Sequence, residues 1–277
     1  ICGASNEDLP SIADLCAVYA AAGVHCVDVA ADVAVVKAAR TGLAWVQAKY
    51  GCLPWLMVSI SDGQDIHFRK AWFDPHKCPS DCPRPCSKVC PAAAIPSKGP
   101  IDKNRCYGCG RCLPVCPLGL IEERNRYLRL EQIGPLLSAI GPDALEIHTA
   151  PGRHEAFERT LKAILKTNLP LKRIAVSCGL EGHGITNQLL AKELWLRYEC
   201  LRRNGQKAIW QLDGKPMSGD KGRATAKVAI NLWKSIQPIA PPGPLQLAGG
   251  TNAHTISYIS ENNRPEGIAF GGMARKL

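Results

Sequence analysis

The chain has 277 residues, of which 46% are hydrophobic and 21% charged, and its formal net charge is +10. This composition supplies enough apolar side chains for a folded core, and no apolar run is long enough to cross a membrane. Lysines and arginines are scattered with few aromatic residues among them, which favours a solvated surface over a nucleic-acid-binding face. The chain begins at Ile1 without a methionine, so we expect a further segment to precede it.

Short β-rich runs alternate with Ala/Leu-rich amphipathic stretches along most of the chain. Most of the β-rich runs are almost continuously apolar, which is typical of parallel strands buried on both faces. The predicted strands are 1–4, 24–30, 55–61, 145–149, 174–178, 208–212, 245–248 and 268–271. The predicted helices are 9–22, 33–50, 154–166, 185–203, 221–236 and 253–260.

Eight strands with helical crossovers predict an α/β fold, specifically a (β/α)8 TIM-like barrel. An open doubly wound sheet is the alternative, although no G-x-G-x-x-G follows any strand. A cysteine-rich run interrupts the alternation between strands 3 and 4, so we expect an inserted ferredoxin-like module at the mouth of the barrel. The predicted domains are residues 1–74 (first part of the barrel), 75–121 (iron–sulfur insertion) and 122–277 (second part of the barrel).

The interrupting run contains eight cysteines in two groups of four, and each group ends in Cys-Pro. The second group has the spacing C-x2-C-x2-C-x3-C-P of bacterial two-cluster ferredoxins, and the first has a looser C-x3-C-x3-C-x3-C-P. In this motif three thiolates bind one [4Fe–4S] cluster and the fourth binds the other. We therefore predict two clusters, one held by Cys78, Cys82, Cys86 and Cys116, the other by Cys106, Cys109, Cys112 and Cys90.

Zinc, disulfides and a helical stripe explain these cysteines less well. A zinc ribbon uses two CxxC pairs and leaves no role for eight cysteines. Pro79, Pro83 and Pro85 would break a helix through the first group. Disulfides need an oxidising compartment, whereas the remaining cysteines lie mostly in apolar surroundings, as reduced core thiols do: Cys2, Cys16, Cys26, Cys52, Cys178 and Cys200.

Glycines and polar residues follow several predicted strands. In barrels, glycine pairs after strands 7 and 8 often bind phosphate through backbone N–H groups, although they can also simply permit tight turns. The candidate flavin- or phosphate-binding residues, with FMN as the cofactor, are Gly249, Gly250, Thr251, Gly271, Gly272 and Lys215. Other candidates at the same edge of the barrel are Asp62, Asp65, His67, His148, Thr149 and Asp213.

Several segments resemble the light-dependent period protein (LdpA) family of cyanobacteria, which has algal and plant homologues. The resemblance covers nearly the whole chain, and its most specific part is the cysteine-and-proline run 78–86. The eight cysteines match the cluster-binding cysteines of the family. The similar segments are 1–5, 22–32, 59–63, 67–70, 73–75, 78–86, 245–252 and 268–276.

The resemblance implies an iron–sulfur protein that reports the redox state of photosynthetic electron flow, in cyanobacteria to the circadian clock input. The implied partners are a redox protein such as ferredoxin, or a thylakoid electron-transfer complex, and clock-input proteins if the chain is cyanobacterial. The implied location is the chloroplast stroma, including its thylakoid surface, or the cyanobacterial cytoplasm.

Three functions remain open from the sequence. The favoured one is redox sensing or electron transfer without enzymatic turnover. The second is an oxidoreductase whose clusters pass electrons to a flavin or a phosphate-bearing substrate in the barrel mouth. The third is a docking or assembly subunit of a larger photosynthetic redox complex. Four cations near the ligands would favour reduced clusters or dock an acidic electron donor: Arg84, Lys88, Arg105 and Arg111.

Overall fold

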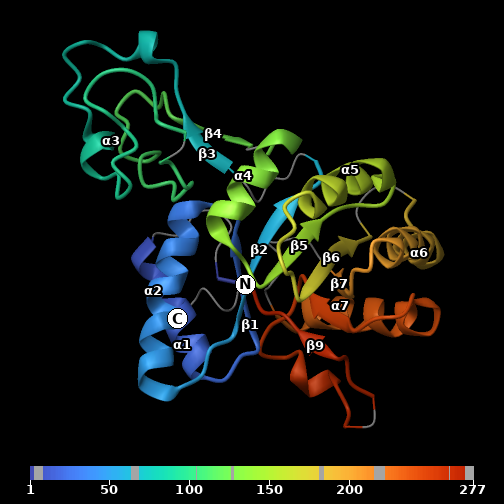
Figure 1. Cartoon of the computed structure of the whole chain (residues 1–277). Coiled ribbons are helices and arrows are strands. Elements are labelled where there is room, and N and C mark those ends of the chain that lie inside the picture. The colour runs from blue at the N-terminus through green and yellow to red at the C-terminus, as the bar shows by residue number, and fades with distance from the viewer. Residues whose placement is uncertain are drawn as a thin grey trace.

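The structure is a computed structural model that describes residues 1–2, 9–63, 69–103, 105–125, 128–180, 184–214, 222–261 and 263–271. A curled parallel sheet forms its centre, and helices cover the outer side of that sheet (Figure 1). A smaller, cysteine-rich segment stands apart from the sheet (Figure 1). No helix in the described part of the chain has the length and apolarity that a membrane crossing requires.

Seven parallel strands make up the sheet within the described residues, and their order in the sheet is their order in the chain. A doubly wound sheet reverses its strand order at a switch point, so that alternative is wrong. The strands are β1 (Cys26–Ala30), β2 (Trp55–Ser61), β5 (Ala144–His148), β6 (Arg173–Gly179), β7 (Ala208–Asp213), β8 (Leu245–Ala248) and β9 (Gly267–Ile268). Each overlaps a strand predicted from the sequence.

The beginning of the chain lies between the two edges of this sheet. The backbone N–H of Cys2 donates to the carbonyl oxygen of Asp28 in β1 at 2.8 Å. The backbone nitrogen of Ile1 donates to the carbonyl oxygen of Phe270, just after β9, also at 2.8 Å. Residues 1 and 2 belong to no strand, and residues 3 and 4 of the predicted first strand lie outside the described residues. A complete eight-stranded barrel therefore stays a prediction.

Helices of the sheet domain follow the predicted ranges closely. The Asp32 side chain caps α2 by accepting from the N–H of Ala34 at 3.0 Å, and Gly51 ends it with φ 70°. Helices α1 and α2 approach closely at Gly42, where a Cβ would lie 2.1 Å from the carbonyl oxygen of Ala13. The helices are α1 (Leu9–Ala21), α2 (Val33–Tyr50), α4 (Leu130–Ile140), α5 (His154–Leu165), α6 (Asn187–Arg203) and α7 (Gly222–Ile236).

Two elements of the sheet domain differ from the sequence prediction. Helix α4, which precedes β5, was not predicted. The predicted helix 253–260 is wrong, because only a short 3-10 turn, η4 (Ile256–Tyr258), forms there. In this loop the side chains of Asn252 and Thr255 bond to backbone N–H groups, and such local bonds compete with helix formation.

The two faces of the sheet have different chemistry, contrary to the prediction of apolar side chains on both faces. The outer face carries residues such as Val58, Ile147 and Val176, which belong to the main apolar core with the helices. Alternate residues point to the concave face, and there the middle row is polar. This row consists of Asp28, Ser59, Glu146, Ser177, Gln211 and Gln246.

Residues 69–125, called the cysteine module below, lie between β2 and β5. Its two ends pair as an antiparallel ribbon of β3 (Arg69–Trp72) and β4 (Glu122–Asn125). The module has a small apolar core of its own, which includes Ala71, Phe73 and Ile95. Two short helical turns, η1 (Pro75–Lys77) and α3 (Pro85–Lys88), lie within it. The predicted domain boundaries at 74/75 and 121/122 stay predictions.

The module contacts the sheet domain near the carboxyl end of β1. The Lys70 ammonium lies 3.2 Å from the Asp32 carboxylate, which follows β1. The hydroxyl of Tyr107 accepts a hydrogen bond from the backbone N–H of Leu9, the first residue of α1, at 3.3 Å. Tyr107 is 5% exposed and belongs to the main apolar core rather than to the core of the module. Tyr107 therefore connects the second cysteine group to the sheet domain.

Candidate functional site

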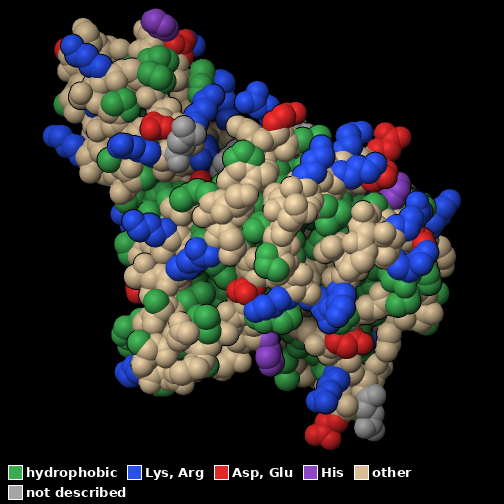
Figure 2. All heavy atoms as spheres, in the orientation of Figure 1, with side chains coloured by type: hydrophobic (Ala, Val, Ile, Leu, Met, Phe, Trp, Pro, Cys, Tyr) green, Lys and Arg blue, Asp and Glu red, His purple; other side chains and the backbone are tan. Residues whose placement is uncertain are grey.

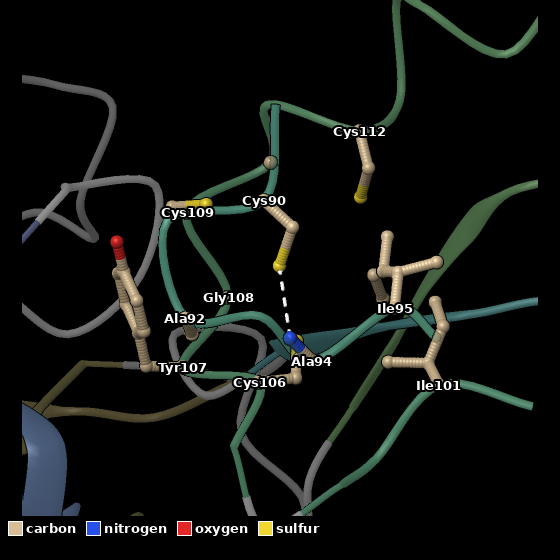
Figure 3. Close-up of a pocket in the computed structure, with 12 residues that line it drawn as sticks. Cys90, Ala92, Ala94, Ile95, Ile101, Cys106, Tyr107, Gly108, Cys109 and Cys112 are labelled. Atoms are coloured by element: carbon tan, nitrogen blue, oxygen red, sulfur yellow. Dashed lines mark hydrogen bonds between the residues drawn. The ribbon is translucent and has the colours of Figure 1, made fainter. Parts of the chain in front are cut away.

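The cysteine module contains two cavities, and each is surrounded by four cysteines. One cavity is lined by Cys90, Cys106, Cys109 and Cys112 (Figure 3). The other is lined by Cys78, Cys82, Cys86 and Cys116. These are the two ligand sets predicted from the spacing, including the exchanged fourth cysteines. Ligation itself stays a prediction.

The chain positions the fourth cysteine of each group away from the other three. In the cavity of Figure 3, the sulfur atoms of Cys90 and Cys112 point toward the same space, although these residues come from different groups. The Cys90 sulfur accepts a hydrogen bond from the N–H of Ala94 at 3.3 Å. In the other cavity the Cys116 sulfur accepts from the N–H of Leu120 at 3.4 Å. Such N–H···S bonds stabilise negative charge on a thiolate and so suit cluster ligation.

Apolar side chains form the remaining walls of both cavities. Ala71, Ile95 and Ile101 surround the first, while Phe73 and Leu120 are among those surrounding the second. Within the described residues, no three metal-ligating side chains converge as they would around a single ion. The donor set, the N–H···S bonds and the apolar walls fit iron–sulfur clusters, whose potentials depend on burial and on hydrogen bonds to sulfur.

The four cations predicted near the ligands have two different environments. Arg84 is buried and donates to the carbonyl oxygens of Pro96 and Gly99 at 2.8 and 3.0 Å, so it holds the loop of the module together. Its guanidinium also lies over the ring of Phe73. Lys88, Arg105 and Arg111 are exposed. Figure 2 shows lysines and arginines distributed over the visible face, including the module, with acidic residues between them.

The pKa values of the thiols differ between the two cavities. Burial, followed by the charges of Cys106 and Cys109, raises the pKa of Cys112 to about 12, and burial also raises the pKa of Cys109. In the other cavity burial raises the pKa of Cys86. Burial also acts to raise the pKa of Cys116. Hydrogen bonds from backbone N–H groups, chiefly that of Leu120, outweigh burial, so the pKa of Cys116 is lowered.

Cluster assembly is expected to depend on pH, and more strongly in the cavity of Cys109 and Cys112. Iron binds the thiolate, so a thiol that is protonated at neutral pH, such as Cys109 or Cys112, must lose its proton. Cys116 has a lowered pKa and therefore releases less than a full proton, although Cys86 in the same cavity has a raised pKa. Reconstitution of iron-free protein should therefore yield more of the cluster held by Cys109 and Cys112 at pH 8.5 than at pH 7. The cluster beside Cys116 should vary less. EPR spectra and iron content measured across this range test the expectation, and equal pH profiles for the two clusters would contradict it.

The predicted flavin- or phosphate-binding residues are only partly described. Gly250, after β8, has φ 92°, a conformation that favours glycine, and Thr251 donates to the carbonyl oxygen of Ala269 at 2.5 Å. This bond ties the loop after β8 to the segment after β9. Gly249 and Gly271 lie in the same two loops, while Lys215 and Gly272 lie outside the described residues. Among the described residues after β8, the helical element is the short 3-10 turn η4, so the predicted helix N-terminus for phosphate does not form at residues 253–260.

Polar residues at the carboxyl ends of the strands form a buried network. Asp62, after β2, accepts hydrogen bonds from Thr149 and from Arg153, and Thr149 also accepts from Arg197 at 3.1 Å. Burial raises the pKa of Asp62, and the bond from Thr149 opposes this shift. Asp62 and Thr149 were candidates from the sequence, and their buried bonds fit a structural role. Asp65 and His67 lie outside the described residues.

A second polar network occupies the concave face, and the sequence analysis missed most of it. Ser59 lies within hydrogen-bond distance of the carboxylates of both Asp28 and Glu146. Burial, then the charge of Glu146, raises the pKa of Asp28 well above its usual range. Burial also acts on Glu146, but bonds from His148 and Ser59 outweigh it and lower its pKa. The period-two placement of polar residues inside apolar strands was the signal that could have found this row.

His148 and Asp213, both candidates from the sequence, join this network through Ser177. The Nδ1 atom of His148 lies 3.1 Å from Ser177 Oγ, which also donates to the Asp213 carboxylate. Serine, histidine and aspartate meet here, and the Nδ1 atom of His148 lies 3.9 Å from the Asp213 carboxylate and 3.8 Å from that of Glu146. The same nitrogen therefore faces the serine and both carboxylates, whereas a triad histidine uses one ring nitrogen for the aspartate and the other for the serine. Ser177 is also only 1% exposed. This arrangement is not that of a nucleophilic triad.

Comparisons with known proteins place these features in a family. Residues 78–127 match the sequence profile described as the LdpA Fe-S cluster-binding domain, and residues 136–277 match the light dependent period A C-terminal domain. The protein named Light dependent period A from Synechococcus elongatus is 45% identical to this chain over an alignment of 284 residues. The alignment covers 99% of this chain and 79% of that protein. No solved structure matches the chain.

Proposed function

The chain belongs to the light dependent period A family, and we propose that it is an iron–sulfur protein that senses redox state or transfers electrons. One [4Fe–4S] cluster is held by Cys78, Cys82, Cys86 and Cys116, and the other by Cys106, Cys109, Cys112 and Cys90. The observation that carries this proposal is the grouping of the eight cysteines around two cavities. When bound, such clusters accept and release single electrons.

The residues of the module would set the properties of these clusters. The N–H groups of Ala94 and Leu120 donate to ligand sulfurs, which favours the more negative, reduced state. Apolar walls disfavour it by lowering the local dielectric, so the two effects oppose each other. The exposed cations Lys88, Arg105 and Arg111 suit an acidic electron donor such as a soluble ferredoxin.

The name of the relative supports a proposal about the signal that this protein carries. A protein named for a light-dependent period fits clusters whose oxidation state follows photosynthetic electron flow. In a cyanobacterium, the cytoplasmic protein would pass this state to clock-input proteins. In a plastid, the same sensing chemistry would act in the stroma on a different partner.

Anaerobic purification followed by iron analysis, visible spectroscopy and EPR tests the proposed function. We expect about eight iron atoms per chain, broad cluster absorbance that bleaches on reduction, and no resolved flavin bands. Reoxidation should restore the spectrum over repeated cycles without loss of iron. An iron content near one per chain, or absorbance that does not respond to reductant, would refute the two-cluster proposal.

The same spectrum tests the oxidoreductase alternative. Bound FMN would add resolved flavin bands and would release a yellow cofactor on denaturation. Such a result would support the oxidoreductase alternative, in which the clusters transfer electrons to a flavin near Gly250 and Thr251. The docking-subunit alternative predicts instead that the loaded protein co-purifies with a photosynthetic redox complex.

A further inference from the structure

A large cavity opens at the amino ends of the strands, on the concave face of the sheet. It encloses about 780 Å³, within the range of about 300–1,000 Å³ that is usual for small-molecule sites. The cysteine module follows the carboxyl end of β2, so this cavity is separate from the cluster cavities. Ala269 and Phe270, which follow β9, line the cavity, whereas the glycines after β8 are not among its lining residues. No role in the proposed cluster chemistry accounts for it.

The walls of this cavity combine apolar side chains with a few polar groups. Met57, Ala144 and Ala175 belong to a small apolar cluster at the amino ends of the strands. Asp28, Gln211 and Gln246, from the polar middle row, line the same cavity. An apolar enclosure with a small number of convergent polar groups is typical of a site for an organic ligand.

Asp28 is the group in this cavity whose bonding is incomplete. It is 4% exposed, and its Oδ1 atom accepts a hydrogen bond from Ser59 at 2.6 Å. Its Oδ2 atom is buried and has no hydrogen-bond partner among the described residues. A buried carboxyl oxygen without a hydrogen-bond partner is unfavourable, and a bound ligand that donates a hydrogen bond would satisfy it.

The neighbouring polar groups already have partners and are held in fixed orientations. Gln246 donates to the amide oxygen of Gln211 at 2.9 Å, and Gln211 donates to Glu146 at 3.0 Å. Glu146 also accepts from Ser59. The single hydroxyl proton of Ser59 cannot serve both carboxyl groups at once. Burial and the charge of Glu146 raise the pKa of Asp28, so Asp28 holds a proton of its own while the cavity is empty. A cation that donates to Asp28 would take the place of that proton.

The charge around the cavity selects the sign of the ligand. Asp28 and Glu266 line it and Glu146 lies behind it, while neither lysine nor arginine is among its lining residues in the described part of the chain. His25 is the basic side chain among the described lining residues, so acidic groups outnumber basic ones around the cavity. An excess of acidic groups favours a cation over an anion. The aromatic ring of Trp55, which also lines the cavity, can contact either an apolar body or a cationic head.

We propose that this cavity binds a small organic cation with an apolar body, whose ammonium or amidinium group donates a hydrogen bond to Asp28. The apolar body lies against Met57, Ala144 and Ala175. This site is independent of iron, so the failure of either proposal leaves the other standing.

The test uses the cluster-loaded full chain and three probes of the same size: benzamidine, benzamide and benzoate. These probes share a ring and differ in charge. We expect isothermal titration calorimetry to show one benzamidine bound per chain, with benzamide at least tenfold weaker, about the effect of one charged hydrogen bond, and no heat from benzoate. Benzoate or benzamide that binds as tightly as benzamidine, or an absence of benzamidine binding at millimolar concentration, would overturn the proposal.

Asp28→Asn tests the residue itself. Asparagine has the same shape and keeps an oxygen acceptor for Ser59, but it carries no charge and places an NH2 group at the Oδ2 position. We expect at least a tenfold loss of benzamidine affinity at unchanged iron content and circular dichroism. Glu131→Gln, which removes an exposed carboxylate on α4, is the matched control and should bind normally. Unchanged affinity in folded Asp28→Asn would overturn the assignment.

A second variant covers the case in which Asp28→Asn does not fold. Ala175→Leu adds bulk to the cavity wall without altering a charge. We expect it to abolish benzamidine binding while leaving the cluster spectrum intact. Benzamidine binding that survives this substitution would place the probe elsewhere and overturn the proposal.

Discussion

Cys109→Ser is expected to lower the iron content from about eight atoms per chain to about four. Cys109 lines the cavity that it shares with Cys90, Cys106 and Cys112, so one cluster should be lost and the other kept. Cys52→Ser is the control, because Cys52 is exposed and lies outside the module. Iron analysis and EPR of the dithionite-reduced protein measure the result. An iron content that stays near eight would contradict the assignment of Cys109.

Double variants distinguish the exchanged ligand sets from sets that follow chain order. Cys90 lines the cavity of Cys109, although it belongs to the first group in the sequence. Adding Cys90→Ser to Cys109→Ser should therefore cost little further iron, since both changes affect the same cluster. Adding Cys116→Ser to Cys109→Ser should remove nearly all of the iron. The reverse pattern would show that each group binds its own cluster.

Arg197→Leu is expected to destabilise the protein by about 3 kcal/mol, the usual result of breaking a buried ion pair on one side. Arg197 has a fully buried side chain that forms an ion pair with Glu193 at 2.5 Å. It also donates to Thr149 and to the carbonyl oxygen of Ala150 at 3.1 and 2.9 Å, and so joins α6 to the end of β5. Leucine would leave the Glu193 carboxylate and two acceptors without a donor.

Urea denaturation of the cluster-loaded protein under anaerobic conditions measures this effect. Arg202→Leu, on the same helix, is the control, because the pair between Arg202 and Glu199 is exposed and should contribute little. The urea midpoint of Arg197→Leu should fall clearly below that of the control. Equal midpoints would show that the buried network adds no net stability.

Most helices and strands of the sheet domain were predictable, because the capping residues and apolar patterns in the sequence agree with the way these elements pack. Helix α2 matches its predicted range at both ends, since Asp32 caps it and Gly51 terminates it. Helix α4 was missed because Gly134 and Pro135 interrupt its pattern and indicate a break in the chain. The helix predicted over 253–260 failed because side-chain bonds from Asn252 and Thr255 satisfy the local backbone instead.

The cysteine spacing by itself determined the most specific prediction about this protein, the two exchanged ligand sets. A short motif carries that information because three ligands from one tight loop reach one cluster and the fourth does not. The grouping around the two cavities agrees with those sets, although Cys78 and Cys116 are far apart in the sequence.

Only the tertiary structure showed the concave polar row and the cavity beside it. Alternation along each strand predicts that Asp28, Glu146 and Gln211 each lie on one face of their strand. It does not predict that this face is the concave side of the sheet. Curling of the sheet brings these side chains together, and that curvature depends on packing between strands that lie far apart in the chain. The ligand motif is local and is therefore visible in the sequence, whereas the cavity exists only after the sheet has formed.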